Sequence, residues 1–476
     1  MSETDRIFLI APSTIRNKGD AAIYVGALQL ITQCLPNCKV SLSVEDYTEQ
    51  NIDFISRMFE FKNVDITEGL IQGTKKVLTN TLKANKVFTK KSRSNDEKVS
   101  TSVSKNDSSA FRDLRTHVHF FKYFHTPLLL TKLIQKLNIN QEPFNLLRNS
   151  NTAVSLGHNL TRSCLSNSLL SYYVPKLVFG KKSVIFPISI SKYSYSNVML
   201  TNKLLEAYTR FILEKMDGIM IREQSSFETL RNRLHIRNKN VFSVADTAFL
   251  LPKGNTQEVL RMVSDQGVPI EKPALAVCIR GRSYFSTYSS YVDDEYFSFI
   301  GNFAKVVDTL IEKLGVNVYF IPMTMLRPDG LDDYDYQGAL RIYERMKQKS
   351  QARAGIINTW DMTPGEIAAL LEQIDFVLTM RLHQLITAST VAVPSVLVLP
   401  NQELKAVGIT KSLGLHDYLV NLGEPSQTLY KTVVNKVLEG FANRDELSQT
   451  IKTRLPVIQK SVRVAGEILS SLMRAP

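Results

Sequence analysis

Cysteine and tryptophan are scarce in this sequence, with four and one respectively among 476 residues. Cys34 and Cys38 are the only cysteines close together, and no second pair supplies the Cys/His spacing of a zinc site. We therefore expect buried, reduced thiols. A G-x-G-x-x-G turn is also absent, so the sequence gives no indication of a dinucleotide site.

Long hydrophobic runs are absent as well. No stretch approaches the roughly 18–20 apolar residues that span a bilayer. The polar start Met1–Arg6 has an acidic character and leads into only a short apolar run, Ile7–Ile10. That run is too short for a secretory signal. These absences predict a soluble, cytoplasmic protein, with a peripheral position at the inner face of the membrane as a further expectation.

Acidic residues are depleted in one part of the chain. The formal net charge is +13, and residues 71–125 carry twelve Lys/Arg against four Asp/Glu. Such a stretch can bind a nucleic acid, an anionic membrane surface or an anionic substrate. Its aromatic residues gather near its end instead of alternating with the basic ones, so we expect no nucleic acid. Within it, residues 91–110 are mostly Ser, Lys, Asn and Asp, which predicts a mobile loop.

Apolar runs of four to eight residues alternate with segments of helical period along most of the chain, as in Ala274–Ile279 and the segment Tyr296–Leu314 after it. This alternation is typical of parallel sheets covered by helices on both faces. We predict an α/β fold with two Rossmann-like domains facing across a cleft. The predicted domains are residues 1–255, with the basic insertion at about 71–125, and residues 256–448. A C-terminal helix, 449–476, is expected to pack back across the first domain.

The segment Asn17–Ile23 lies where the first strand gives way to the first helix. Gly19 would allow close approach of a substrate to the backbone, and the N–H groups of the new helix could hold an anion or a polar substrate. Asp20 could orient a sugar hydroxyl or accept its proton. The alternative is that Asn17 and Asp20 only cap the helix.

Arginines follow three other predicted strands. Arg222, Arg280 and Arg381 each come directly after an apolar run, where ligands of parallel sheets bind. A guanidinium group there can bind a carboxylate or phosphate through two N–H groups, although each arginine could instead form a structural ion pair. His383 lies two residues after Arg381 and could give or take a proton near neutral pH.

A metal site is not expected. His117, His119 and His125 are the only clustered histidines, and they lie in the basic segment with little acidic company.

Taken together, several ordered blocks resemble the polysaccharide pyruvyl transferase family, in particular its colanic-acid-type ketal pyruvyltransferases. They are Asn17-x-Gly19-Asp20-x-Ala22-Ile23, Ile221-Arg222-Glu223-x-Ser225 with Leu230, Asp246-Thr247-Ala248, Arg381-Leu382-His383 with Pro394, and Glu403-Leu404-Lys405-Ala406-Val407-Gly408. The resemblance extends from about residue 7 to 420. It implies a fold similar to the GT-B glycosyltransferases and phosphoenolpyruvate as the donor substrate, with no other cofactor.

Position by position, the resemblance implies roles for the residues of these blocks. The first domain would bind the acceptor and the second the donor. The implied donor-binding residues are Arg222, Arg381, Leu382, Arg280 and Lys405. His383 would be the catalytic acid, with Asp20 as base or acceptor-orienting group. The implied acceptor-binding residues are Asn17, Gly19, Gly157, His158 and Asn159. Gly157-His158-Asn159 departs from the family's glycine-rich turn, and the loop at residues 91–110 is longer than usual.

The expected reaction moves pyruvate from phosphoenolpyruvate onto two hydroxyls of a glycan sugar as a ketal, in exopolysaccharide or cell-surface polysaccharide synthesis. The expected partners are the donor, a glycan or lipid-linked oligosaccharide acceptor, and an anionic membrane in peripheral contact. Two alternatives stay open. One is a GT-B type glycosyltransferase that uses a nucleotide sugar. The other is an anion-binding module that acts through residues 71–125.

Overall fold

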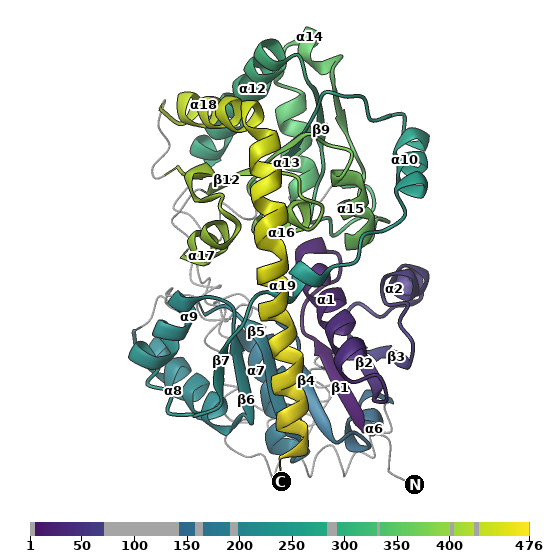
Figure 1. Cartoon of the computed structure of the whole chain (residues 1–476), viewed down its shortest axis with the longest axis vertical. Coiled ribbons are helices and arrows are strands. Elements are labelled where there is room, and N and C mark those ends of the chain that lie inside the picture. The colour runs from purple at the N-terminus through teal and green to yellow at the C-terminus, as the bar shows by residue number, and fades with distance from the viewer. Residues whose placement is uncertain are drawn as a thin grey trace, which may run out of the picture.

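A computed structural model describes residues 5–70, 142–157, 165–190, 199–282, 293–330, 334–399, 404–422 and 428–475. The basic segment predicted at 71–125, including the loop at 91–110, lies outside these residues, as do His158 and Asn159. The described chain forms two halves, each built on a parallel sheet with helices on both faces (Figure 1). The predicted α/β fold is confirmed.

The first sheet has seven parallel strands in the order β3-β2-β1-β4-β5-β6-β7. They are β1 (Arg6–Ala11), β2 (Lys39–Val44), β3 (Val64–Glu68), β4 (Thr152–Ser155), β5 (Lys182–Ile188), β6 (Gly218–Ile221) and β7 (Val241–Ser243). The order reverses between β1 and β4. Ligands of doubly wound sheets bind beyond the carboxyl ends of the strands at such a reversal.

The second sheet has six parallel strands in the order β10-β9-β8-β11-β12-β13. They are β8 (Ala274–Cys278), β9 (Asn317–Phe320), β10 (Ala354–Ile356), β11 (Phe376–Thr379), β12 (Ser395–Leu399) and β13 (Leu419–Asn421). Here the order reverses between β8 and β11. The central strands are buried along their whole length, as expected for a sheet covered on both faces, and this explains their continuous apolar sequences.

Helices connect the strands in both halves. In the first half they are α1 (Lys18–Cys34), η1 (Glu49–Asn51), α2 (Ile52–Met58), α6 (Glu142–Arg148), α7 (Leu165–Tyr173), η2 (Val174–Val178), α8 (Met199–Lys215), α9 (Gln224–Glu228), η3 (Thr229–Arg233) and η4 (Thr247–Leu250). In the second they are α10 (Thr256–Asp265), α12 (Asp293–Leu314), α13 (Asp335–Tyr343), α14 (Gln348–Gln351), α15 (Pro364–Leu371), α16 (Leu382–Thr390), α17 (Leu404–Leu413), η5 (His416–Tyr418) and α18 (Thr428–Ala442). The largest apolar core is continuous across the two halves.

The last helix, α19 (Arg444–Arg474), runs along both halves (Figure 1). It contacts α1, β5, β6 and η4 of the first half and α16, α17 and α18 of the second. Pro456 lies inside it. The buried residues of α19 recur at helical spacing from Leu447 to Leu469, so one face of the helix joins the core. We predicted a helix over 449–476; it begins at Arg444 and ends at Arg474.

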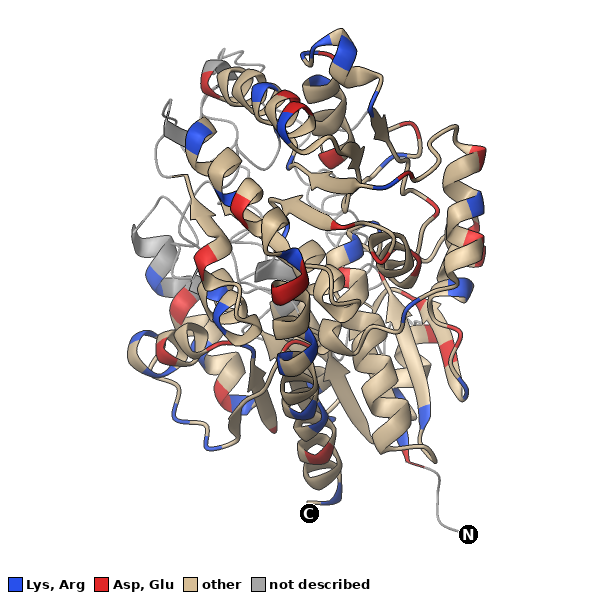
Figure 2. Cartoon of the chain, turned by 45° about the horizontal axis from the view of Figure 1, so that its top comes forward, with Lys and Arg blue, Asp and Glu red and all other residues tan. Residues whose placement is uncertain are grey.

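Charge is mixed over the described surface. Figure 2 shows lysine and arginine interspersed with aspartate and glutamate on the helices of both halves, including α19. Among the described residues, no helix is both long and apolar enough to cross a membrane.

Candidate functional site

The carboxyl edges of the two sheets face each other across the contact between the halves. The chain leaves β1 into the segment Ser13–Asp20, while Arg222 follows β6. In the second half, Arg280 follows β8 and Arg381 follows β11, the two strands that flank the reversal of strand order. Helix α16 contacts both α1 and η4 of the first half. Asn17, Gly19, Arg222, Arg381 and His383 therefore lie on the segments that meet between the halves.

Gly19 of the first half and His383 of the second are in close contact. A Cβ atom placed on Gly19 would lie 2.8 Å from Cβ and 2.9 Å from Nδ1 of His383. Real Cβ atoms essentially never come closer than 3.0 Å to another heavy atom. The glycine is therefore required for helix α1 to reach the histidine.

His383 also faces a buried carboxylate. Its Nε2 atom is buried and lies 3.5 Å from Oδ2 of Asp246, at the limit of a hydrogen bond. Asp246 caps η4, because its Oδ1 accepts a hydrogen bond from the backbone N–H of Ala248. Its Oδ2, the oxygen that faces His383, accepts a hydrogen bond of 2.6 Å from Arg222. Asp246 thus lies between the predicted catalytic acid and a predicted donor-binding arginine.

Arg222 is almost fully buried and held from two sides. Its Nε donates to Ser189 Oγ at 3.1 Å, and its terminal nitrogen donates to Asp246. Burial alone would lower the pKa of Arg222, but the carboxylates of Asp246 and Glu223 raise it above its ordinary value. Burial alone would raise the pKa of Asp246, but Arg222 and then His383 hold it well below its usual range. The pair is therefore a buried ion pair at neutral pH.

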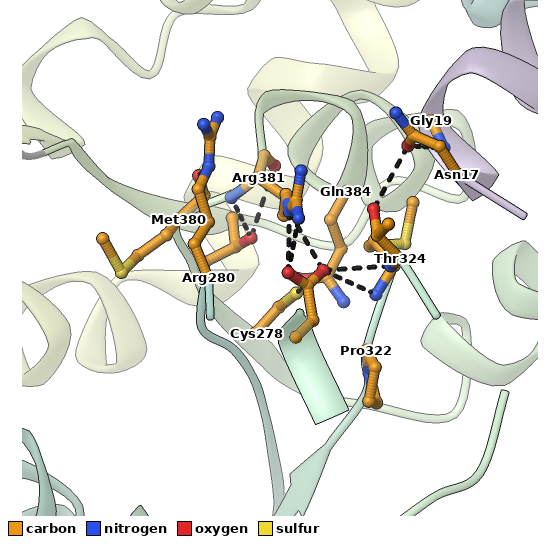
Figure 3. Close-up of polar contacts among 12 residues, drawn as sticks. Asn17, Gly19, Cys278, Arg280, Pro322, Thr324, Met380, Arg381 and Gln384 are labelled. Atoms are coloured by element: carbon orange, nitrogen blue, oxygen red, sulfur yellow. Dashed lines mark hydrogen bonds and ion pairs between the residues drawn. The ribbon is translucent and has the colours of Figure 1, made fainter. Parts of the chain in front are cut away.

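Arg381 forms a second buried pair, with Asp335 (Figure 3). Its Nε lies 2.9 and 3.1 Å from the two carboxylate oxygens, and its terminal nitrogen bonds one of them. The side chain of Asp335 is fully buried, whereas that of Arg381 is 16% exposed. One edge of the Arg381 guanidinium is therefore committed to the protein and fixes the plane of the group.

Asn17 and Asp20 are joined in a small polar network. Asn17 Oδ1 accepts from the backbone N–H of Gly19 and caps α1, and Asn17 Nδ2 donates to Asp20 at 2.9 Å. Ser13 Oγ donates to the same Asp20 oxygen at 2.8 Å, and Thr324 Oγ1 lies 3.4 Å from Asn17 Oδ1. Both ends of the Asn17 amide are engaged, which supports its capping role.

The other three predicted donor-binding residues differ in their burial and in the groups that they contact. Arg280 is nearly buried, and its Nε donates to the carbonyl of Met380 at 2.8 Å; in Figure 3 its guanidinium points away from the Arg381 pair. Leu382 is packed in the apolar core. Lys405 lies in the first turn of α17, which contacts α9 just after Arg222.

Gly157 has a packing role that the sequence reasoning did not anticipate. A Cβ atom there would lie 2.4 Å from the carbonyl oxygen of Pro187 and 3.1 Å from a methyl group of Ile23. The glycine therefore lets the end of β4 pass closely between β5 and α1. This contact is sufficient to explain the residue, so its predicted acceptor-binding role remains a prediction.

Sequence reasoning missed the two buried carboxylates that hold the arginines. Asp246 was noticed only as part of a family block, although it follows β7 as the other site residues follow their strands. Asp335 follows Asp332, Asp333 and Tyr334, and no pattern distinguishes it from its acidic neighbours. Among the described residues, no group of three or more His, Cys, Asp or Glu side chains is placed to hold a metal ion.

Solved structures of several glycosyltransferases share this fold. TcCGT1 in complex with UDP is 13% identical, with a TM-score of 0.54 and 99% of this chain and 98% of that chain covered. The Anabaena protein HepE in complex with UDP and glucose is 11% identical, with a TM-score of 0.53 and coverage of 98% and 100%. The Medicago truncatula UGT71G1 complexed with UDP-glucose is 11% identical, with a TM-score of 0.51 and coverage of 99% and 98%. These similarities show a GT-B-like fold.

No curated protein sequence matches the chain. The model of one protein family, described as polysaccharide pyruvyl transferase, matches residues 17–402. The match begins at Asn17, the cap of α1, and continues past Arg381 and His383, so it includes α1, η4 and α16, which contact one another between the halves. Since it covers most of the sequence, the chain belongs to the polysaccharide pyruvyl transferase family, and this membership supports pyruvyl transfer in polysaccharide synthesis.

Proposed function

We propose that this protein transfers the pyruvyl group of phosphoenolpyruvate to two hydroxyls of one glycan sugar, forming a ketal and releasing inorganic phosphate. The observation that carries the proposal is the meeting of Arg222, Arg381 and His383 at one interface between the sheets. Phosphoenolpyruvate bears a carboxylate and a phosphate, about three negative charges near pH 7. Arginines at the carboxyl ends of strands suit such a ligand because each can offer parallel N–H groups to an oxyanion.

His383 is the proposed general acid. It gives a proton to the methylene carbon of phosphoenolpyruvate, and positive charge develops at C2. One sugar hydroxyl adds its oxygen to C2 and loses its proton to Asp20 or solvent. The bond between C2 and the phosphate oxygen then breaks, phosphate leaves with the electron pair, and the second hydroxyl closes the ketal as its own proton is lost. The methylene group has become a methyl group.

The two buried pairs support these roles. Asp246 lies against Nε2 of His383, so it would stabilise the charged imidazolium and hold the ring in one orientation. Arg222 and Arg381 would stabilise the charge on the departing phosphate, and because both are already held by the fold they need little reorganisation. The first half would bind the glycan, and the second half would bind the donor together with Arg222 of the first half. No metal and no cofactor other than the donor is part of the proposal.

The proposal is tested by running the reaction in heavy water. Each turnover should leave one solvent deuteron in the methyl group of the ketal, seen as a mass increase of about one unit and as a change in the methyl proton signal. His383→Ala should lower kcat by about 10²–10⁴ with a smaller effect on donor KM, because protonation belongs to the transition state. A genuine ketal product without deuterium would refute the mechanism.

The solved relatives in complex with UDP make a nucleotide-sugar glycosyltransferase the second candidate. Such an enzyme would release UDP from a UDP-sugar, would not need phosphoenolpyruvate and would incorporate no deuterium. Parallel assays with UDP-glucose and phosphoenolpyruvate on the same glycan decide between the two. The lipid-linked acceptor, the contact with an anionic membrane and the cytoplasmic location stay predictions, which a vesicle sedimentation assay with and without anionic lipid would begin to test.

A further inference from the structure

Asp335 is the most completely buried carboxylate at the interface, with a fully buried side chain. It begins α13, and its two oxygens have different partners. Oδ1 bonds Arg381, while Oδ2 bonds Arg381 and also accepts the backbone N–H groups of Met323 at 3.1 Å and Thr324 at 3.0 Å. A buried carboxylate is costly unless it is paired and hydrogen-bonded in this way.

The segment held by Oδ2 is also bonded to the first half of the molecule. The carbonyl of Met323 accepts the backbone N–H of Lys18 at 2.8 Å. Thr324 forms an isolated bridge with Asn17, and its hydroxyl lies 3.4 Å from the Asn17 amide oxygen (Figure 3). Asp335 therefore bonds Arg381 directly and is linked to the first turn of α1 through Met323 and Thr324.

We propose that Asp335 is a positioning residue that orients the Arg381 guanidinium for the donor and, through residues 323–324, fixes the segment Asn17–Asp20 beside it. The proposal rests on the proposed function for the identity of the donor. Asp335 itself touches no reacting atom. It acts through Arg381 on one side and through two backbone N–H groups on the other, so the two effects can be separated by substitution.

The variant Asp335→Asn separates the effect on Arg381 from the effect on residues 323–324. The asparagine oxygen can take the place of Oδ2 and keep the bonds to Met323 and Thr324. Its NH₂ group then replaces Oδ1 and faces the N–H groups of Arg381, donor against donor. This variant should lose the orientation of Arg381 but keep the segment in place. Asp335→Ala should lose both.

A matched control is available in the same half. Asp308 is also buried and also accepts a backbone N–H, from Lys347, but it lies on α12 and has no contact with Arg381 among the described residues. Asp308→Asn should lower the melting temperature without changing affinity for phosphoenolpyruvate. This variant therefore measures how far a buried Asp→Asn change alone alters the melting temperature and the affinity.

The first measurement is titration calorimetry of the full chain with phosphoenolpyruvate. Asp335→Asn should bind about tenfold to a hundredfold more weakly than the wild type, as expected when a binding group is misplaced by about 1 Å, while Asp308→Asn should bind normally. Equal affinities for Asp335→Asn and the wild type would overturn the proposal. The second measurement is amide hydrogen exchange of residues 13–21, which Asp335→Ala should speed and Asp335→Asn should not. Unchanged exchange in Asp335→Ala would overturn the link to α1.

A double-mutant cycle covers the case in which Asp335→Asn alone fails to fold. Arg381→Met combined with Asp335→Asn leaves no unpaired charge, so the double variant should melt above Asp335→Asn. In the Arg381→Met background, Asp335→Asn should cause no further loss of phosphoenolpyruvate affinity. A further loss there would show that Asp335 does not act through Arg381. If the wild type binds no phosphoenolpyruvate, the proposed function fails, and melting temperature and hydrogen exchange still decide the role of Asp335.

Discussion

Gly19→Ala tests the contact on which the proposed acid depends. The added Cβ would lie 2.8, 2.9 and 3.0 Å from three atoms of His383, at the base of its ring. The nearest of them, Cβ, is fixed to the backbone of α16, so rotation of the histidine side chain cannot remove this overlap, and α1 and α16 must separate by several tenths of an ångström. Overpacking of this kind costs about 1–3 kcal/mol of unfolding free energy.

The chain offers a matched control in Gly301. It lies inside α12, and a Cβ placed on it would have no neighbour within 4 Å. Gly301→Ala should therefore stabilise the protein by about 0.5–1 kcal/mol, the usual gain from replacing glycine inside a helix. Gly19 is also helical, so the difference between the two variants measures the contact with His383 and not the general effect of the substitution.

The two variants should diverge both in stability and in activity. We expect Gly19→Ala to lie about 2 kcal/mol or more below Gly301→Ala in unfolding free energy, measured by chemical denaturation. Its kcat for phosphate release from phosphoenolpyruvate should fall about tenfold to a hundredfold because His383 is displaced, whereas Gly301→Ala should keep normal kcat. If Gly19→Ala were as stable and as active as Gly301→Ala, the close contact between α1 and His383 would be wrong.

Two further predictions concern the buried Arg–Asp pairs. Arg381→Lys keeps the charge but cannot offer N–H groups from two nitrogens in one plane to Asp335, so the KM for phosphoenolpyruvate should rise about tenfold or more; an unchanged KM would remove Arg381 from the donor site. Since the pKa of Asp246 is lowered on folding, its contribution to stability is present above about pH 4 and is lost as the pH falls below that value. Asp246→Asn should therefore be less stable than the wild type by about 3–5 kcal/mol at pH 7, and the gap should narrow towards pH 3 in denaturation curves. A gap that stays constant with pH would contradict the assigned charge of Asp246.

The fold could be predicted because its evidence is local. The run Ala274–Ile279 is apolar throughout since β8 is buried on both faces, and the helix predicted near Tyr296–Leu314 is α12, which begins three residues earlier. The positions of Arg222, Arg280 and Arg381 could be predicted for the same reason, because each follows a strand and parallel strands end at a common edge.

The partners of these arginines could not be predicted, because their role depends on contacts between distant parts of the chain. Asp335 is 46 residues from Arg381, and Asp246 is 24 residues from Arg222. Burial of an arginine at a sheet edge requires a nearby acceptor, but the sequence does not say which aspartate supplies it. The close contact of Gly19 with His383 could not be predicted either, and the expected role of Gly19 in acceptor binding stays a prediction.

The burial of Lys18 could not be predicted from the sequence either. It is fully buried beside Arg16, and its Nζ donates to the carbonyl of Trp360 at 2.9 Å and lies 4.3 Å from the centre of the Phe54 ring. Arg16 donates to the same carbonyl at 2.6 Å and stacks on the Trp360 ring. Burial, followed by the charge of Arg16, lowers the pKa of Lys18 well below 10.5.

Lys18→Met should therefore change how stability depends on pH. The unfolded chain keeps the lysine proton up to about pH 10.5, while the folded chain releases it at lower pH. Between these values the unfolded state binds more protons, so the unfolding free energy rises with pH by at most about 1.4 kcal/mol per unit. Lys18→Met should reduce this rise between pH 7 and 10. Lys39, which is half exposed and paired with Asp65, provides the control: Lys39→Met should follow the wild type. Parallel curves for Lys18→Met and Lys39→Met would show that Lys18 keeps its charge in the folded protein.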